Sequence, residues 1–417
     1  MSNERFVPYQ IIKRALRRKY SQLSLQMVLI LILMGSISIQ AATEIHLVME
    51  GWGEGGWKAV VHSGFYYHPD EVYVNGNKHD VCHQTCDLTP GRNNVIIKFN
   101  NQLTSCNSMF YYLYDIIEVD LSHFVASQVL DMKSMFHGCS NLVKVTFGDN
   151  IDTSKVTNMG QFFENCHNLT TIDLSKLNTA KVTNMESAFN SCRSLKTIDL
   201  SHLDTSKVTN MIWMFYGCNN LESINLRNID TSSVERTINM FYECYNLKSI
   251  DLSNLDFSKV NNMENMFYRC SNLESINLEN TRTSLVQNTA NMFFECDKLT
   301  SIDLTDLDLS KVDTMEKMFS GCDVLENIIF GTKYTASPIN LHETFRECDK
   351  LVSIDLSHWD FSRVNNMVLM FYQCDLLEHI KFGTASTPTS INMEKIVQKC
   401  RKIKNIDFTP LGRSKVE

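Results

Sequence analysis

Cysteine recurs at a fixed interval along most of this chain, and that interval restricts what the chain can fold into. Ten cysteines, from Cys166 to Cys400, follow one another at sequence intervals of 26, and the interval from Cys139 to Cys166 is 27. One further step of 26 back from Cys139 reaches Leu113. A period of this length is typical of repeat architectures, in which similar units stack on one another. The sequence therefore predicts an array of about twelve units over residues 103–417.

The unit that begins at Cys192 shows what one repeat contains. Leu195, Ile198 and Leu200 are apolar and alternate with polar residues at the end of this run, which predicts a short strand with one buried face. A polar corner, Asp204–Ser206, has the residues that begin helices. The helical spacing of the apolar residues after it predicts a short helix: Val208, Met211, Met214, Phe215 and Cys218. The predicted fold is an α/β repeat solenoid similar to leucine-rich repeats, with a parallel sheet on one face and short helices on the other.

The segment before the array, residues 43–102, has a different pattern. Its strand-like runs are Glu44–Met49, Trp57–Val61, Glu71–Val74 and Asn94–Phe99. Asn75-Gly76 is a strong signal for a tight turn. We expect a small N-terminal β cap that covers the first strand of the array, followed by a helix that contains Met109 and Phe110.

Residues 1–42 resemble a targeting segment. Basic residues between Lys13 and Lys19 precede an apolar run from Met27 to Met34, and small residues follow up to Ala42. This order is typical of a signal peptide cleaved after Ala41 or Ala42, whereas the wider window Leu23–Ala42 is long enough for an uncleaved signal anchor. The expected location is secreted or at the cell surface, with membrane attachment only if the segment is not cleaved.

Three strings in the repeats carry a family resemblance: Ile198-Asp199-Leu200-Ser201, Asp204–Met211 and Met214–Cys218. With them the chain, from about Leu103 to Phe408, resembles the BspA-like leucine-rich-repeat surface proteins of bacteria and protists. The resemblance implies a cell-surface or secreted protein, often an adhesin-like binder of host or matrix components.

The cysteines allow several chemistries. Leu113 fills the cysteine position of an otherwise regular unit, and leucine can replace a packed thiol but not a disulfide or a metal ligand. We therefore expect the regularly spaced cysteines to be free thiols in the core. In the cap, Cys82 and Cys86 are the candidate disulfide. Zinc held with His79 and His83 is the alternative there, and Cys106 could compete for either cysteine.

Polar residues at the outward positions of the strands form columns along the predicted sheet. The candidate ligand-face residues are Thr171, Asp173, Ser175, Thr197, Asp199, Ser201, Asp251, Ser253, Asp303 and Asp355. One interpretation is a solvated sheet face whose hydroxyls bridge the carboxylates of neighbouring units. Another is a ligand surface, because solenoids commonly bind along one extended face. Calcium could also bind there, since carboxylates and hydroxyls supply oxygen ligands.

The sequence favours a binding protein over an enzyme. It has no glycine-rich phosphate loop and no His-Glu-x-x-His motif, and we expect neither a cofactor nor a metal. A net charge of −8 argues against a nucleic-acid partner. The expected function is an adhesin that recognises a protein or a glycan. The alternative is a structural spacer or self-associating surface component, and we expect self-association through the C-terminal edge, where a strand is predicted through Ile403, Ile406 and Phe408.

Overall fold

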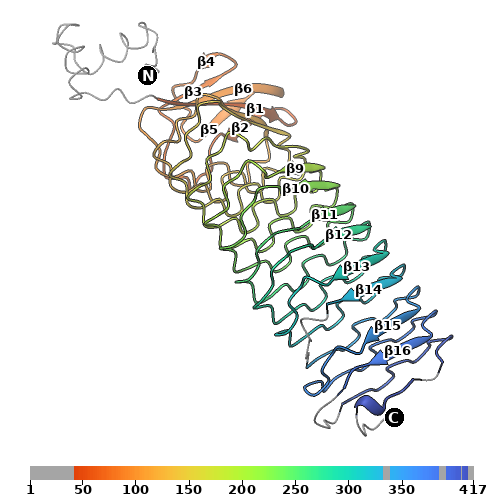
Figure 1. Cartoon of the computed structure of the whole chain (residues 1–417). Coiled ribbons are helices and arrows are strands. Elements are labelled where there is room, and N and C mark those ends of the chain that lie inside the picture. Colours follow the sequence, from red (N-terminus) through yellow and green to blue (C-terminus); the bar gives the residue numbers. More distant parts are fainter. Residues whose placement is uncertain (1–41, 332–338, 385–390, 405, 412–417) are drawn as a thin grey trace, which may run out of the picture.

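The units of the array stack into one long solenoid, which carries a small sheet at its N-terminal end (Figure 1). The computed structural model describes residues 42–331, 339–384, 391–404 and 406–411. Residues 1–41, which are all but the last residue of the predicted targeting segment, lie outside the described residues. Within them there is no helix with the length and apolar character that crossing a bilayer requires.

The N-terminal sheet is built on two long antiparallel strands. β1 (Thr43–Gly51) pairs with β6 (Gly91–Phe99), and alternate residues of β1 are buried. β3 (Glu71–Val74) lies on the other side of β6 and turns into β4 (Asn77–Lys78). The predicted tight turn at Asn75-Gly76 is confirmed, with φ angles of 49° and 82°. β2 (Gly56–Ala59) and β5 (Thr85–Leu88) form a separate antiparallel pair.

The cap and the array share this first sheet. β1 also pairs antiparallel with β7 (Ile116–Leu121), and β7 pairs parallel with β8 (Lys144–Phe147). The strand order is β4-β3-β6-β1-β7-β8, so hydrogen bonds run without interruption from the cap into the first units. The expectation of a β cap that covers the first strand of the array is confirmed.

Short parallel strands then follow along one side of the solenoid, one in each unit from β9 to β16. They pair two by two, and paired residues are one repeat period apart in the sequence, as for Thr197 and Ser223. The strands are β9 (Thr197–Asp199) with β10 (Ser223–Asn225), β11 (Ser249–Asp251) with β12 (Ser275–Asn277), β13 (Ser301–Leu304) with β14 (Asn327–Phe330), and β15 (Ser353–Leu356) with β16 (His379–Phe382).

The predicted helices are wrong: the side opposite the strands consists of three-residue turns. In one unit the amides of Ala188 and Cys192 bond to carbonyls three residues back, which makes tight turns. The amides on either side of Ala188, those of Ser187 and Phe189, donate instead to carbonyls of the next unit, at 2.9 Å each. In an α-helix all these amides would donate to carbonyls of the same helix. Here they also join successive units, and the segment that contains Met109 and Phe110 is built in the same way.

Left-handed backbone makes these turns possible. Two residues in a typical unit have positive φ, for example Ser187 at 54° and Ser191 at 57°. Most such positions hold residues other than glycine, although β-carbon crowding disfavours this conformation by about 1–2 kcal/mol. The hydrogen bonds between units offset that cost. Three-residue turns also direct the apolar residues inward at the spacing that predicted a helix.

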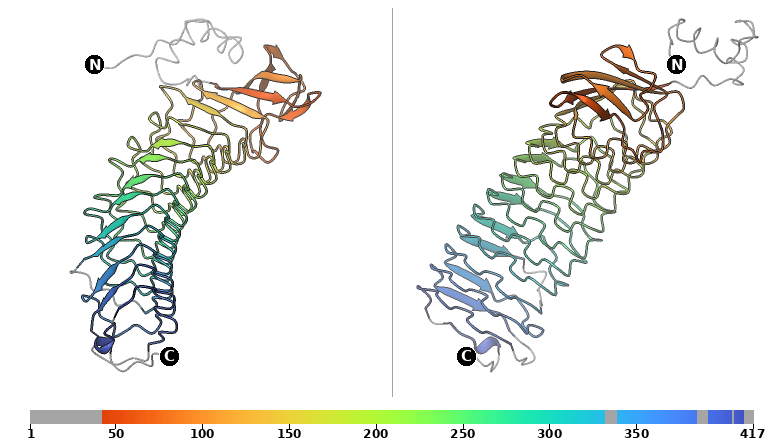
Figure 2. Two further views of the ribbon diagram at one scale, coloured as in Figure 1. Left: turned by 90° about the vertical axis from the view of Figure 1, so that its right-hand side faces the viewer. Right: turned by 180° about the vertical axis from the view of Figure 1, so that it is seen from behind.

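Each core position repeats as a column along the solenoid. Phenylalanine rings stack from Phe110 to Phe371 with centroids 5.2–5.8 Å apart. A second parallel ladder consists of single bridges at one position per unit, mostly asparagine, as between Asn184 and Asn210. The Asn210 side chain also accepts a hydrogen bond from the amide of Ile212 at 3.1 Å. Figure 2 shows that the solenoid is curved, with the turns on the inner side of the bend and the strands on the outer side.

The corner after each strand also differs from the expected helix start. Asp204 accepts a bond from the amide of Ser206 at 3.0 Å, and the buried Thr205 bonds to the neighbouring unit. At the other end, the structure assigns no strand to the described residues after Cys400, so the strand predicted there is wrong. A short 3-10 helix, η1 (Thr409–Leu411), follows and buries Leu411.

Candidate functional site

All ten predicted ligand-face residues lie on one side of the solenoid, the strand face. We define the strand face by the outward residues of β7 to β16 and of the equivalent segment Thr171–Ser175. Eight of the ten are exposed, while Ser201 and Ser253 are half-buried. The buried residues that alternate with them, such as Ile198 and Leu200, fix the outward direction because successive side chains of a strand point to opposite faces.

The carboxylates of this face are held by local backbone bonds. Asp173, Asp199, Asp251, Asp303 and Asp355 each accept a hydrogen bond from the amide two residues later, at 2.8–3.0 Å. We expected hydroxyls to bridge the carboxylates of neighbouring units. In the structure these five carboxylates instead close turns within their own units. Between units, the Asn225 amide donates to Asp199 at 3.0 Å and the Lys381 ammonium donates to Asp355 at 3.2 Å.

These bonds keep the face negatively charged. Hydrogen bonds from Ser175 and Ser201 lower the pKa of Asp173 and Asp199 below the ordinary aspartate value. Hydrogen bonds from Ser357, together with the nearby Lys381, do the same to the pKa of Asp355. A carboxylate that accepts bonds in its charged form is stabilised in that form. The face thus presents fixed anionic acceptors.

A groove lies across the strand face where two strand pairs meet. β10 and β11 belong to different two-stranded sheets, and the space beside them encloses about 620 Å³. Polar side chains line it and half-buried Ile224 and Ile229 are also part of its wall. We call it the strand-face groove and define it by its polar residues: Asn225, Arg227, Asn228, Asp251, Ser253 and Asn254. It brings the predicted Asp251 and Ser253 together with a cation and three amides.

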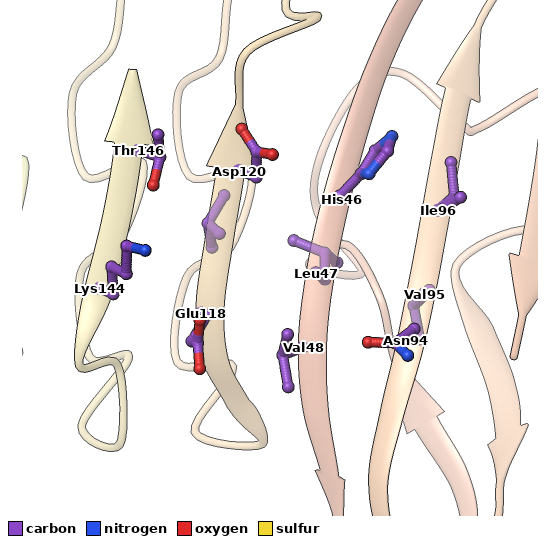
Figure 3. A pocket seen from close by; sticks show the side chains of 11 residues that line it. His46, Leu47, Val48, Asn94, Val95, Ile96, Glu118, Asp120, Lys144 and Thr146 are labelled. Carbon is purple, nitrogen blue, oxygen red and sulfur yellow. The ribbon is translucent and has the colours of Figure 1, made fainter. Parts of the chain in front are cut away.

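The strand face continues onto the cap. A depression of about 330 Å³ spans β6, β1, β7 and β8, and Figure 3 shows His46, Asp120 and Thr146 side by side on these strands. Burial alone would raise the pKa of Asp120, but hydrogen bonds from Ser122 and the nearby His46 and His123 hold that pKa below its ordinary value. The antiparallel strand β1 thus adds His46 to a face otherwise made of parallel repeats.

Two residues that change the chemistry of this face were not among the predicted ones. Ile329 is in register with Asp303 and is 53% exposed, and Lys381 is in register with Asp355 and contacts it at 3.2 Å. Both lie one repeat period after an aspartate of the predicted column, so alignment by that period could have found them. The face is less uniform than the aspartate column suggests.

The regularly spaced cysteines are free, as predicted. They are buried except for the half-buried Cys400, and the structure leaves each of them unpaired. Each thiol from Cys139 to Cys400 donates to a phenylalanine carbonyl of the preceding unit, as from Cys244 to Phe215 at 3.2 Å. Burial raises the pKa of Cys218 to about 12, so the thiol form persists at neutral pH.

Cys82 and Cys86, the candidate disulfide, lie close together in the cap, with their Cα atoms 5.0 Å apart. In the part of the chain that the structure describes, no three His, Cys, Asp or Glu side chains are grouped as metal ligands would be. The disulfide stays a prediction that a chemical test can address.

Comparison with solved structures gives distant similarities. A leucine-rich cell surface protein from Faecalibacterium prausnitzii is 17% identical, over 73% of this chain and 82% of that one, with a TM-score of 0.37. A leucine-rich repeat protein from Eubacterium ventriosum is 15% identical, over 71% and 94%, with a TM-score of 0.32. The functional domain of InlJ from Listeria monocytogenes, which includes a cysteine ladder, is 15% identical over 79% and 73%, with a TM-score of 0.18.

Comparison with curated proteins gives no match. A family model described as "Mycoplasma protein of unknown function, DUF285" matches residues 104–223, 144–249, 209–334 and 290–408. These overlapping matches cover the repeat array from its first turn to its last described strand and beyond. The chain belongs to this DUF285 family.

Proposed function

We propose that this chain is a secreted or surface-displayed binding protein that recognises a protein or a glycan through its strand face. The strand-face groove is the observation that carries the proposal. It combines the carboxylate of Asp251, the guanidinium of Arg227 and three amide side chains in one concave site. Sites that bind with specificity place a few polar groups precisely in a concavity.

The acceptors of this face are positioned before any ligand arrives. Backbone bonds hold the carboxylates of Asp199, Asp251 and Asp303, so binding does not have to order them. Preorganised groups lose less conformational entropy on binding. The targeting segment at residues 1–42 supports a location where such a face would meet ligands outside the cell.

The test replaces Asp199, Asp251 and Asp303 together by asparagine. Asparagine accepts the same backbone bond, as Asn225 and Asn277 do in this chain, so folding should be unaffected. Binding of the purified protein would be measured on arrays of immobilised glycans and extracellular proteins. We expect a loss of about tenfold or more, because one hydrogen bond to a charged group contributes about 1.5–3 kcal/mol.

The chain offers a matched control at the next corner of each unit. Asp204, Asp230 and Asp308 also accept a bond from the amide two residues later, so replacing them by asparagine makes the same chemical change away from the strands. Unchanged binding in the strand-face variant, or equal losses in both variants, would rule out the strand face.

The alternative function, a spacer or self-associating component, has one observation in its favour. The strand residues repeat with little change, as Ser249-Ile250-Asp251 and Ser301-Ile302-Asp303 show. If the protein is a spacer, it should bind none of the immobilised glycans or proteins. Neither triple variant should then differ from the wild type in this assay. Self-association of the wild-type protein in sedimentation experiments would then support this role.

A further inference from the structure

A second concave site lies where the cap meets the first turn of the array. The loop after Val61 and the turn that contains Ser105 to Ser108 enclose a depression of about 300 Å³. The amide of His62 donates to the carbonyl of Met109 at 2.8 Å, which joins the loop to the turn. We call this site the junction pocket and define it by the six lining residues that carry a polar side-chain group: His62, Tyr66, Tyr67, Ser105, Asn107 and Ser108.

An aromatic ring stands open at this pocket. Tyr66 is 85% exposed, the most exposed of the large apolar residues in the described part of the chain. Its ring meets that of Tyr67 edge to face, with centroids 5.0 Å apart. Tyr67 is anchored by its hydroxyl, which lies 2.7 Å from the hydroxyl of Thr104. The exposed ring therefore has a fixed neighbour on one side and solvent on the other.

The rest of the pocket offers neutral hydrogen-bonding groups. The Ser108 hydroxyl donates to Asn107 at 2.8 Å, and the Asn107 amide donates to Asp131 at 2.8 Å. The His62 ring packs edge to face on Tyr111 at 5.3 Å. The described residues that line the pocket include no Asp, Glu, Lys or Arg. These contacts fix the polar groups, and none of the lining groups carries a permanent charge.

From this arrangement we infer that the junction pocket binds a neutral sugar residue of a glycan. A pyranose has an apolar C–H face, which packs on an aromatic ring, and a rim of hydroxyls, which both donate and accept hydrogen bonds. The open face of Tyr66 can pack against the C–H face of the sugar. The hydroxyl, amide and imidazole groups around it can form hydrogen bonds with the sugar hydroxyls. The volume matches one or two sugar residues, and the absence of lining charge disfavours acidic sugars.

This site is separate from the strand face, so its function does not depend on the function proposed above. A proline-rich peptide is another ligand that aromatic surfaces can bind. Such peptides dock in grooves lined by several aromatic residues. Of the three aromatic residues that line the junction pocket, Phe65 is buried and Tyr67 half-buried, so only the ring of Tyr66 is open, which favours the sugar.

The test measures binding of the purified protein to immobilised neutral oligosaccharides that end in glucose, galactose or N-acetylglucosamine, and to their sialylated counterparts. We expect binding to at least one neutral oligosaccharide and a three- to tenfold loss in the Tyr66→Ala variant, a size typical of one aromatic contact. Tyr66→Phe keeps the ring and should retain most of the binding. Tyr114→Ala removes a ring that is 54% exposed but outside the pocket, and it should have no effect.

The strand-face triple variant keeps the junction pocket and should bind these sugars like the wild type, which separates the two sites. The inference is overturned if no neutral oligosaccharide binds, or if binding survives Tyr66→Ala unchanged. It is also overturned if a proline-rich peptide binds through Tyr66 while none of the sugars does. Because Tyr66 is mostly exposed, its replacement should leave the fold intact, and circular dichroism checks this.

Discussion

Replacing Thr205 by valine should weaken the solenoid at a defined corner. Thr205 is buried, and its hydroxyl donates to the carbonyl of Asp230 in the next unit at 2.8 Å. The same hydroxyl accepts a bond from the amide of Asp230, also at 2.8 Å. One oxygen thus makes both of these bonds between two successive units. Valine has nearly the same shape but can make neither bond.

The expected cost follows from these two bonds. A hydrogen bond within a protein contributes about 0.5–1.5 kcal/mol, and a buried partner that loses its bond pays its desolvation cost. Two bonds therefore amount to about 1–3 kcal/mol, and we take about 2 kcal/mol for Thr205→Val. A free-energy change of about 2 kcal/mol corresponds to a change of roughly 30-fold in the equilibrium constant for local opening.

Hydrogen exchange measures this loss at the affected amide. The amide of Asp230 should exchange roughly 30-fold faster in Thr205→Val than in the wild type. Thr205→Ser keeps the hydroxyl and should retain most of the protection. Thr209→Val is the control, since Thr209 is only half-buried and its hydroxyl donates one longer bond, 3.3 Å to Thr183. Wild-type protection of Asp230 in Thr205→Val would refute this explanation of the corner.

Three further predictions concern the cysteines and the stability of the array. Native protein should resist thiol labelling, and denaturation without a reductant should release about twelve thiols while Cys82 and Cys86 stay unreactive; release of all fourteen would contradict the pairing, and release of far fewer than twelve would contradict the free thiols. Asp349→Asn should stabilise the fold by about 0.2–1 kcal/mol at pH 7, because burial and the nearby Asp375 and Asp323 raise the pKa of Asp349. A raised carboxyl pKa destabilises the fold as pH rises above the unfolded value, so this gain should vanish near pH 3, and a thermal midpoint independent of the variant at pH 7 would contradict it. Arg236→Asn places asparagine at the position that bridges Asn210, as most other units have it, and should add about 0.5–1.5 kcal/mol in urea unfolding; a loss of stability would show that Arg236 has a role of its own.

Much of the fold could be predicted from the repeat period, but the pattern of backbone hydrogen bonds could not. The strands, the cap and the buried thiols were predictable because alternation, turn residues and the fixed cysteine interval reflect burial directly. The turns could not be distinguished from helices, because the same residues point inward from either structure. These residues are Met211, Met214, Phe215 and Cys218. The difference lies in where amides such as that of Phe215 donate, in this case to Met240 of the next unit.

The candidate site shows the same division. The outward position of the strand-face residues followed from alternation along each strand. The strand-face groove could not be predicted, because it depends on β10 and β11 belonging to different sheets although their sequences are nearly alike. The junction pocket depends on a contact between residues far apart in the sequence, His62 and Met109, for which no local pattern exists.

Whether the solenoid works outside the cell is decided by locating it on the cells that produce it. An antibody raised against the purified protein would be applied to intact and to permeabilised cells, and the culture medium would be assayed alongside. We predict labelling of intact cells that brief external protease treatment removes, or accumulation of the protein in the medium. Labelling that appears only after permeabilisation, with none of the protein in the medium, would contradict a surface or secreted binding function.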